Sequence, residues 1–137
     1  MIAFDKQRLS EKNMSDAQKP VIIELDAIPW SSHPTILGIE IRMFQNKNSF
    51  SPSDIVIARI ETRSEIPWHV HESESEIAYI LQGTAKLYSA LANPAESPVI
   101  TENDFTEGIA SIIPPGLWHR VINTGDRTVL ILAFHTP

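Results

Sequence analysis

The chain has 137 residues, enough for one domain with a real hydrophobic core and too few for two domains of ordinary size. Its content of 42% hydrophobic and 20% charged residues is ordinary for a soluble globular protein. A net charge of −6 argues against a nucleic-acid backbone or an anionic membrane surface as a partner.

The sequence contains no cysteine, and we expect no targeting signal. No apolar run approaches the roughly 20 residues that a membrane-spanning helix requires. The chain starts with a mixed segment that carries Asp5 and lacks the long apolar stretch of a secretory signal, so we expect a cytoplasmic protein. The absence of cysteine excludes disulfides and fits a reducing compartment. It also means that any bound metal must be held by nitrogen and oxygen atoms.

The first segment, residues 1–20, is polar, and we interpret it as an arm or a short helix outside the main domain, which then covers residues 21–137. Short β-type segments separated by Pro, Gly, Asn and Ser follow in that domain, and its prolines suit loops and strand edges. This regular spacing predicts a β-sandwich or barrel. The predicted strands are 21–25, 36–44, 55–60, 68–71, 77–81, 84–91, 109–113, 118–122 and 128–134.

Three histidines and one glutamate are the strongest candidates for chemistry. Side chains alternate between the two faces of an extended strand, so His69 and His71 would point the same way and could reach one ion. Glu76 follows a polar Glu-Ser-Glu-Ser stretch that can turn the chain back, and it would supply an oxygen from a neighbouring strand. His119 lies far along the sequence and would join a distant strand to the same ion. These four residues are the predicted metal ligands.

Two motifs surround these residues. The first reads His-x-His-x4-Glu-x6-Gly from His69 to Gly83, and the second reads Gly-x5-Pro-x-Gly-x2-His-x3-Asn from Gly108 to Asn123. The chain thereby resembles the cupins, a superfamily of small β-barrels, over roughly residues 55–134. The resemblance implies an all-β double-stranded β-helix, a jelly-roll barrel with a short N-terminal arm. It also implies that the Gly, Pro and Asn residues of the motifs serve turns and backbone. One departure is Arg63, where the first motif usually opens with a glycine that serves a turn.

The proposed ligands leave one or two positions open on a metal that prefers five or six neighbours, which suits a bidentate substrate or dioxygen. Iron(II), manganese, nickel and cobalt fit this set, zinc would also bind, and the sequence does not select among them. Glu72 and Glu74 are expected in the solvated turn. His33 and His135 have no ligand partner in sequence and are expected to be peripheral.

Strand alternation also predicts which other residues face the cavity. Ala78 and Ile80 would point inward, as would Leu117 and Val121 beside His119. The outward residues Ile77, Tyr79 and Leu81 would need cover, for which we expect a homodimer. Arg59 would either bind a substrate carboxylate or, as we favour, extend to solvent. The remaining candidates for shaping the pocket, with core packing as the alternative for most, are Met43, Phe44, Trp68 and Phe134.

The fold hosts enzymes and binding proteins alike, so it does not select a function. We expect a metal-dependent protein that takes a small oxygenated metabolite, with dioxygenase chemistry as the leading hypothesis. The alternatives are a metal-dependent isomerase or lyase, and a non-catalytic module that binds a small ligand. Decarboxylation of oxalate-type acids is less expected, because cupins with that activity are typically two-domain chains.

Overall fold

The structure is a computed structural model that describes residues 22–44 and 55–136, so the predicted arm of residues 1–20 lies outside the described residues. No helix capable of spanning a bilayer is found in these described parts. A short 3-10 helix, η3, covers Leu25–Ala27. The strands are β1 Ser31–Ser32, β2 Ile39–Phe44, β3 Ile55–Ile60, β4 Glu65–His69, β5 Ser75–Gln82, β6 Thr84–Ala90, β7 Thr101–Thr106, β8 Ala110–Ile113, β9 Trp118–Asn123 and β10 Val129–Thr136.

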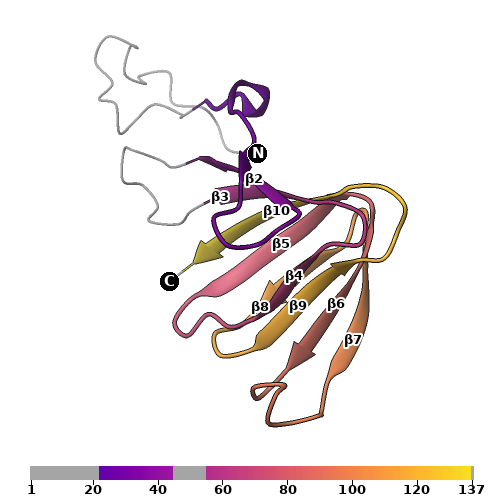
Figure 1. Cartoon of the computed structure of the whole chain (residues 1–137). Coiled ribbons are helices and arrows are strands. Elements are labelled where there is room, and N and C mark those ends of the chain that lie inside the picture. The colour runs from indigo at the N-terminus through magenta and orange to yellow at the C-terminus, as the bar shows by residue number, and fades with distance from the viewer. Residues whose placement is uncertain (1–21, 45–54, 137) are drawn as a thin grey trace, which may run out of the picture.

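The strands form two antiparallel sheets, which Figure 1 shows as two layers. The six-stranded sheet has the order β1-β2-β3-β10-β5-β8, and the four-stranded sheet has the order β4-β9-β6-β7. Strands that are far apart in sequence therefore lie side by side, such as β10 between β3 and β5. This arrangement confirms the predicted all-β jelly-roll barrel.

The hydrophobic core lies between the two sheets and follows the strand alternation. In β5, Ala78 and Ile80 are buried, whereas Tyr79 and Leu81 are exposed on the outer face, as predicted. Among the described residues, Phe105 from β7 is the largest fully buried side chain, so both sheets contribute to the same core. Burial of such apolar surface is the main source of stability for a domain of this size.

Several of the predicted strands differ from the structure. The strand predicted at residues 21–25 is not found in the described part, residues 22–25, where Ile22 is 80% exposed and Leu25 opens η3. Strand β7 was not predicted, because its sequence Thr-Glu-Asn-Asp-Phe-Thr is polar except for Phe105. It lies at the edge of its sheet, where exposed polar and charged residues are common.

Strand β4 begins earlier than predicted and ends at His69, so that His71 lies beyond it. Pro67 interrupts the apolar pattern and hid the beginning of the strand. Proline is tolerated here because β4 is an edge strand and its register with β9 shifts between Ile66 and His69. The same-face argument for His69 and His71 therefore assumed a longer strand than the structure contains.

The turn before β4 shows why the resembled motif usually begins with glycine. Arg63 has a backbone φ of 63°, and it is the only non-glycine residue with a positive φ in the described ranges. This left-handed conformation is unfavourable for a residue with a Cβ atom and costs glycine little. Arg63 nevertheless adopts the turn that leads the chain into β4, so the departure from the motif leaves His69 in place.

The side chain of Asn123, the last residue of the second motif, links the two sheets. It is buried in β9 and donates hydrogen bonds to the carbonyl oxygens of Ile60 in β3, at 3.0 Å, and Arg127, at 2.8 Å. Its own oxygen accepts from the backbone N–H of Gly125 at 3.0 Å. The motif asparagine thus has the structural role that was predicted for it.

Replacing Asn123 with alanine is expected to lower the free energy of unfolding by about 2 kcal/mol, because it leaves buried backbone groups without partners. Urea unfolding monitored by circular dichroism measures the change. The matched control is Asn103→Ala, which removes an exposed asparagine from edge strand β7. Equal losses in the two variants would contradict the assigned role.

Candidate metal centre

The four predicted ligands come together from both sheets. His69 ends β4 and lies opposite His119 of β9 in the strand register of the four-stranded sheet. Glu76 belongs to β5 of the six-stranded sheet, and His71 lies in the connection between β4 and β5. The turn between His71 and Glu76 contains exposed Glu72 and Glu74, as expected.

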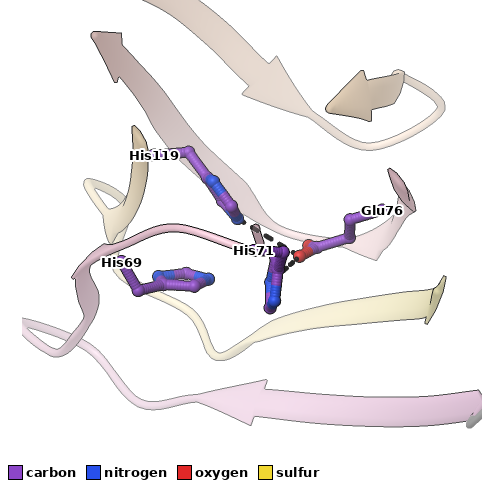
Figure 2. A group of neighbouring side chains, drawn as sticks. All are labelled: His69, His71, Glu76 and His119. Atoms are coloured by element: carbon purple, nitrogen blue, oxygen red, sulfur yellow. Dashed lines mark hydrogen bonds and ion pairs between the residues drawn. The ribbon is translucent and has the colours of Figure 1, made fainter. Parts of the chain in front are cut away.

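The side chains of these residues point toward one another (Figure 2). One nitrogen or oxygen atom from each of His69, His71, Glu76 and His119 lies within 4.8 Å of the others. The Oε2 atom of Glu76 is 3.0 Å from His71 Nε2 and 3.2 Å from His119 Nε2. Three imidazoles and one carboxylate form a donor set that suits a divalent transition metal, so this cluster could hold such an ion.

Backbone hydrogen bonds orient two of the imidazole rings. The Nδ1–H of His69 donates to the carbonyl of Pro67 at 2.8 Å, and the Nδ1–H of His119 donates to the carbonyl of Leu117 at 2.9 Å. A carbonyl oxygen can only accept, so both Nδ1 atoms carry a proton. In the neutral form of each ring, Nε2 is then the atom with a free lone pair. Such partners are typical of metal-binding histidines.

The protonation behaviour of the cluster follows from burial and mutual charge. Burial raises the pKa of Glu76, but the hydrogen bond from His119 and the charges of the surrounding histidines outweigh it and lower the pKa to about 2. Burial is the main reason that the pKa of His69 is lowered, which favours its neutral form. Burial also acts to lower the pKa of His119, but its hydrogen bonds to Glu76 and Leu117 raise it overall. A carboxylate and neutral imidazoles are the forms that bind metal, so the lowered pKa values of Glu76 and His69 favour binding, whereas protonated His119 would have to release a proton to bind an ion.

The cluster lies on the wall of a cavity of about 350 Å³ that both sheets line. Most of the wall is apolar, with side chains such as Val56, Phe105 and Ile131. The buried Oγ atom of Ser111, a residue that also lines the cavity, has no hydrogen-bond partner among the described residues. The polar residues of the wall are His33, His69, His71, Glu76, Ser111, His119 and His135.

The prediction that His33 and His135 are peripheral is wrong, because both line this cavity. His33 accepts hydrogen bonds from the backbone N–H groups of Thr35 and Ile36, each at 3.1 Å, so its ring stabilises a turn at the cavity. The Nε2 atom of His135 lies 3.3 Å from Oε2 of Glu76. Strand alternation held the signal that was missed, since His135 follows the inward residues Ile131 and Ala133 of β10 at intervals of two.

Arg59 does not line the cavity. Its guanidinium pairs with Glu40 at 2.7 Å and lies over the ring of Trp30, 4.4 Å from the ring centre. The adjacent inward position in β3 is Ala58, which does line the cavity. The favoured interpretation, in which Arg59 extends to solvent, differs from this geometry, because its side chain is only partly exposed and is held by Glu40 and Trp30, outside the ligand cavity.

Of the other residues predicted to shape the cavity, only some line it in the described structure. Val121 lines the cavity as predicted, whereas Leu117 packs against the core without being part of the wall. Three of the four remaining candidates are also not part of the wall, and the side chain of the fourth, Phe44, lies outside the described residues. These three are Met43, Trp68 and Phe134.

The chain matches a known protein family. The family model of the cupin domain matches residues 56–135, which is more than half of the chain and includes all four predicted ligands. A search of curated proteins found no match.

Several solved structures share the fold. A predicted oxalate decarboxylase from Thermotoga maritima superposes with a TM-score of 0.70 at 20% identity, covering 85% of this chain and 98% of that chain. The cupin domain of Cnp3 from Schizosaccharomyces pombe gives a TM-score of 0.66 at 16% identity, covering 85% of this chain and 73% of that chain. Oxalate decarboxylase from Lactobacillus farciminis gives 0.65 at 18% identity, with 81% of this chain covered. This chain spans only 31% of that enzyme, and at these identities the likeness shows the fold alone.

Proposed function

This chain belongs to the cupin domain family, and from that premise we propose that it is a metal-dependent protein that takes a small oxygenated metabolite into its barrel cavity. His69, His71, Glu76 and His119 would hold the ion. The observation that supports this proposal most strongly is the convergence of these four donor atoms within 4.8 Å of one another on the wall of a largely apolar cavity. Such cavities with a few converging polar groups are the usual binding sites for small molecules.

The arrangement of the four donors suits the binding of a divalent metal better than a role in packing alone. Four side-chain nitrogen and oxygen donors face one point, and two of the rings have Nδ1 atoms that are already engaged by backbone carbonyls. When bound, such an ion supplies Lewis acidity and, if it is iron, a means of activating dioxygen. Iron(II), manganese, nickel, cobalt and zinc are all compatible with this set.

The residues of the chain would bind and orient the metabolite. The apolar wall would contact a small carbon skeleton and exclude water, and the unpaired Oγ of Ser111 would offer one further hydrogen bond if its side chain turned toward the metabolite. Glu76 is the only carboxylate on the wall among the described residues, and it would take a proton from the metabolite only by lengthening its bond to the ion or shifting away from it during turnover. Dioxygenase chemistry is our leading proposal, because four protein donors would leave positions for a substrate and dioxygen on an ion that prefers five or six neighbours. Isomerase or lyase chemistry and simple ligand binding are the alternatives.

The test is an activity panel on protein loaded separately with iron(II), manganese, nickel, cobalt and zinc. Oxygen consumption with catechols, diketones or 2-hydroxy acids would support the dioxygenase. Aldose–ketose conversion without oxygen would support the isomerase, and saturable binding without turnover would support the binder. Oxalate belongs in the panel with carbon dioxide release as the readout, because the Thermotoga structure is similar to this chain over nearly its whole length and is described as a predicted oxalate decarboxylase.

Glu76→Gln is the critical variant for this panel, and Glu74→Gln is its matched control. Glu74 lies two residues earlier, in the turn before β5, and is exposed and outside the donor cluster. If the wild-type protein bound none of these five metals, the proposed function would be rejected.

We also propose that the chain forms a homodimer through the outer face of the six-stranded sheet. Tyr79, Leu81 and Ile112 are exposed there on neighbouring strands β5 and β8, and apolar side chains of this size gain stability when a partner covers them. One chain has a mass of 15.3 kDa, and sedimentation velocity at micromolar concentration is expected to give twice that mass. A monomeric mass at all accessible concentrations would contradict the proposal.

A further inference from the structure

His135 occupies a distinctive place beside the candidate metal centre. It lies in β10, directly opposite Glu76 of β5 in the strand register. Its Nε2 atom is 3.3 Å from Glu76 Oε2, and its ring centre is 4.6 Å from that of His71. The pairing of β10 with β5 continues through Thr136 and Ser75, so the backbone holds His135 at this position.

The position of His135 differs from that of the four donors. The nitrogen and oxygen atoms of the donor cluster all lie within 4.8 Å of one another, and His135 is not part of that cluster. Its Nε2 atom instead lies within hydrogen-bonding distance of the carboxylate of Glu76. A role beside the ligands therefore fits this residue better than a role as a fifth ligand.

Metal binding changes which groups can hydrogen-bond to Glu76. Three imidazole nitrogens, from His71, His119 and His135, lie within 3.3 Å of the same Oε2 atom. A nitrogen whose lone pair binds a metal carries no proton and cannot donate a hydrogen bond. Once His71 and His119 serve as ligands, His135 is the one described side chain within hydrogen-bonding distance that can still donate to this carboxylate.

We propose that His135 is a positioning residue for the metal centre. Its Nε2–H donates a hydrogen bond to Glu76 and holds the carboxylate in the orientation that binds the ion. This inference rests on the proposed metal-binding function and adds to it a residue from the last strand, outside both sequence motifs. Hydrogen-bond partners of metal ligands fix the geometry of the ligand, and their loss weakens the site without destroying it.

The test compares three variants with the wild-type chain, using nickel(II) and cobalt(II) alone as probes. His135→Ala removes the donor, and His135→Gln places an amide N–H at a similar distance from the backbone. His33→Ala is the matched control, because His33 lines the same cavity but bonds to the backbone of Thr35 and Ile36 and is outside the donor cluster. Calorimetry gives the affinity, and the visible absorption of bound cobalt reports the coordination geometry.

His135→Ala is expected to raise the dissociation constant by about 10- to 100-fold and to alter the cobalt spectrum. His135→Gln should restore most of the affinity, and His33→Ala should bind like the wild-type chain. Thermal melting of each metal-free variant verifies that the barrel is folded before the titration.

Two results would overturn the inference. Wild-type affinity and an unchanged cobalt spectrum in His135→Ala would show that the hydrogen bond does not matter to the centre. Complete loss of binding in both His135→Ala and His135→Gln would make His135 a ligand and not a positioning residue. If the wild-type chain bound neither nickel(II) nor cobalt(II), the inference would also be rejected. That result would contradict the proposed metal-binding function itself, so it is distinguishable from the other two.

Discussion

Replacing His71 with alanine is expected to weaken metal binding by more than about 100-fold, because loss of a ligand exceeds the typical cost of losing a hydrogen-bond partner of a ligand. His71 lies beyond the end of β4, and its side chain is partly exposed, so its removal leaves no void in the hydrophobic core. The metal-free variant should therefore keep the circular dichroism spectrum of a folded barrel. Calorimetric titration with nickel(II) measures the loss of affinity.

Glu72→Ala is the control for this variant, since Glu72 is the next residue along the chain and is exposed in the turn. It should bind nickel(II) like the wild-type protein. Retained affinity in His71→Ala would remove His71 from the ligand set. Unfolding of His71→Ala would indicate that this connection stabilises the barrel, and the case for a functional ion would weaken.

The second large effect is expected in the core. Phe105 is 2% exposed and packs between the sheets, and replacing a buried phenylalanine with alanine typically lowers the free energy of unfolding by about 3–5 kcal/mol. Small domains have only about 5–15 kcal/mol of stability in total, so the variant should unfold at a much lower urea concentration. The measurement is urea unfolding of the metal-free protein, because bound metal would add its own stabilisation.

Leu91→Ala is the control for Phe105→Ala. Leu91 is 90% exposed directly after β6, so its truncation should change the free energy of unfolding by less than about 0.5 kcal/mol. A similar small change in Phe105→Ala would mean that the core does not depend on β7, the strand that the sequence pattern failed to reveal.

The predictable part of the fold was the part with strong local signals. Strand β5 alternates buried and exposed residues over Ala78, Tyr79 and Ile80, and this period of two identifies a strand with one covered face. Strand β7 gives no such signal, because a polar edge strand resembles a loop in sequence. Strand β4 was partly hidden by Pro67, whose tolerance at an edge depends on where the strand lies in the sheet and not on the sequence around it.

The candidate site was predictable where spacing carried the information. His69, His71 and Glu76 lie within eight residues, and their relation to His119 follows from two motifs with fixed internal spacing. His135 has no such relation to Glu76, since 59 positions separate them in the chain. Only the antiparallel register of β10 with β5 brings these residues together, and that register is a property of the folded sheet.

The placement of the four donors on opposite layers has a consequence for how the molecule opens. His69 and His119 belong to one sheet and Glu76 to the other, so the layers cannot part around a bound ion without losing donors. An ion present at 100 times its dissociation constant would add about 2.7 kcal/mol to the work of parting them. Amide hydrogen exchange in β5 and β9 should then slow together as metal is added. The bound ion would in this way suppress the transient opening of the barrel.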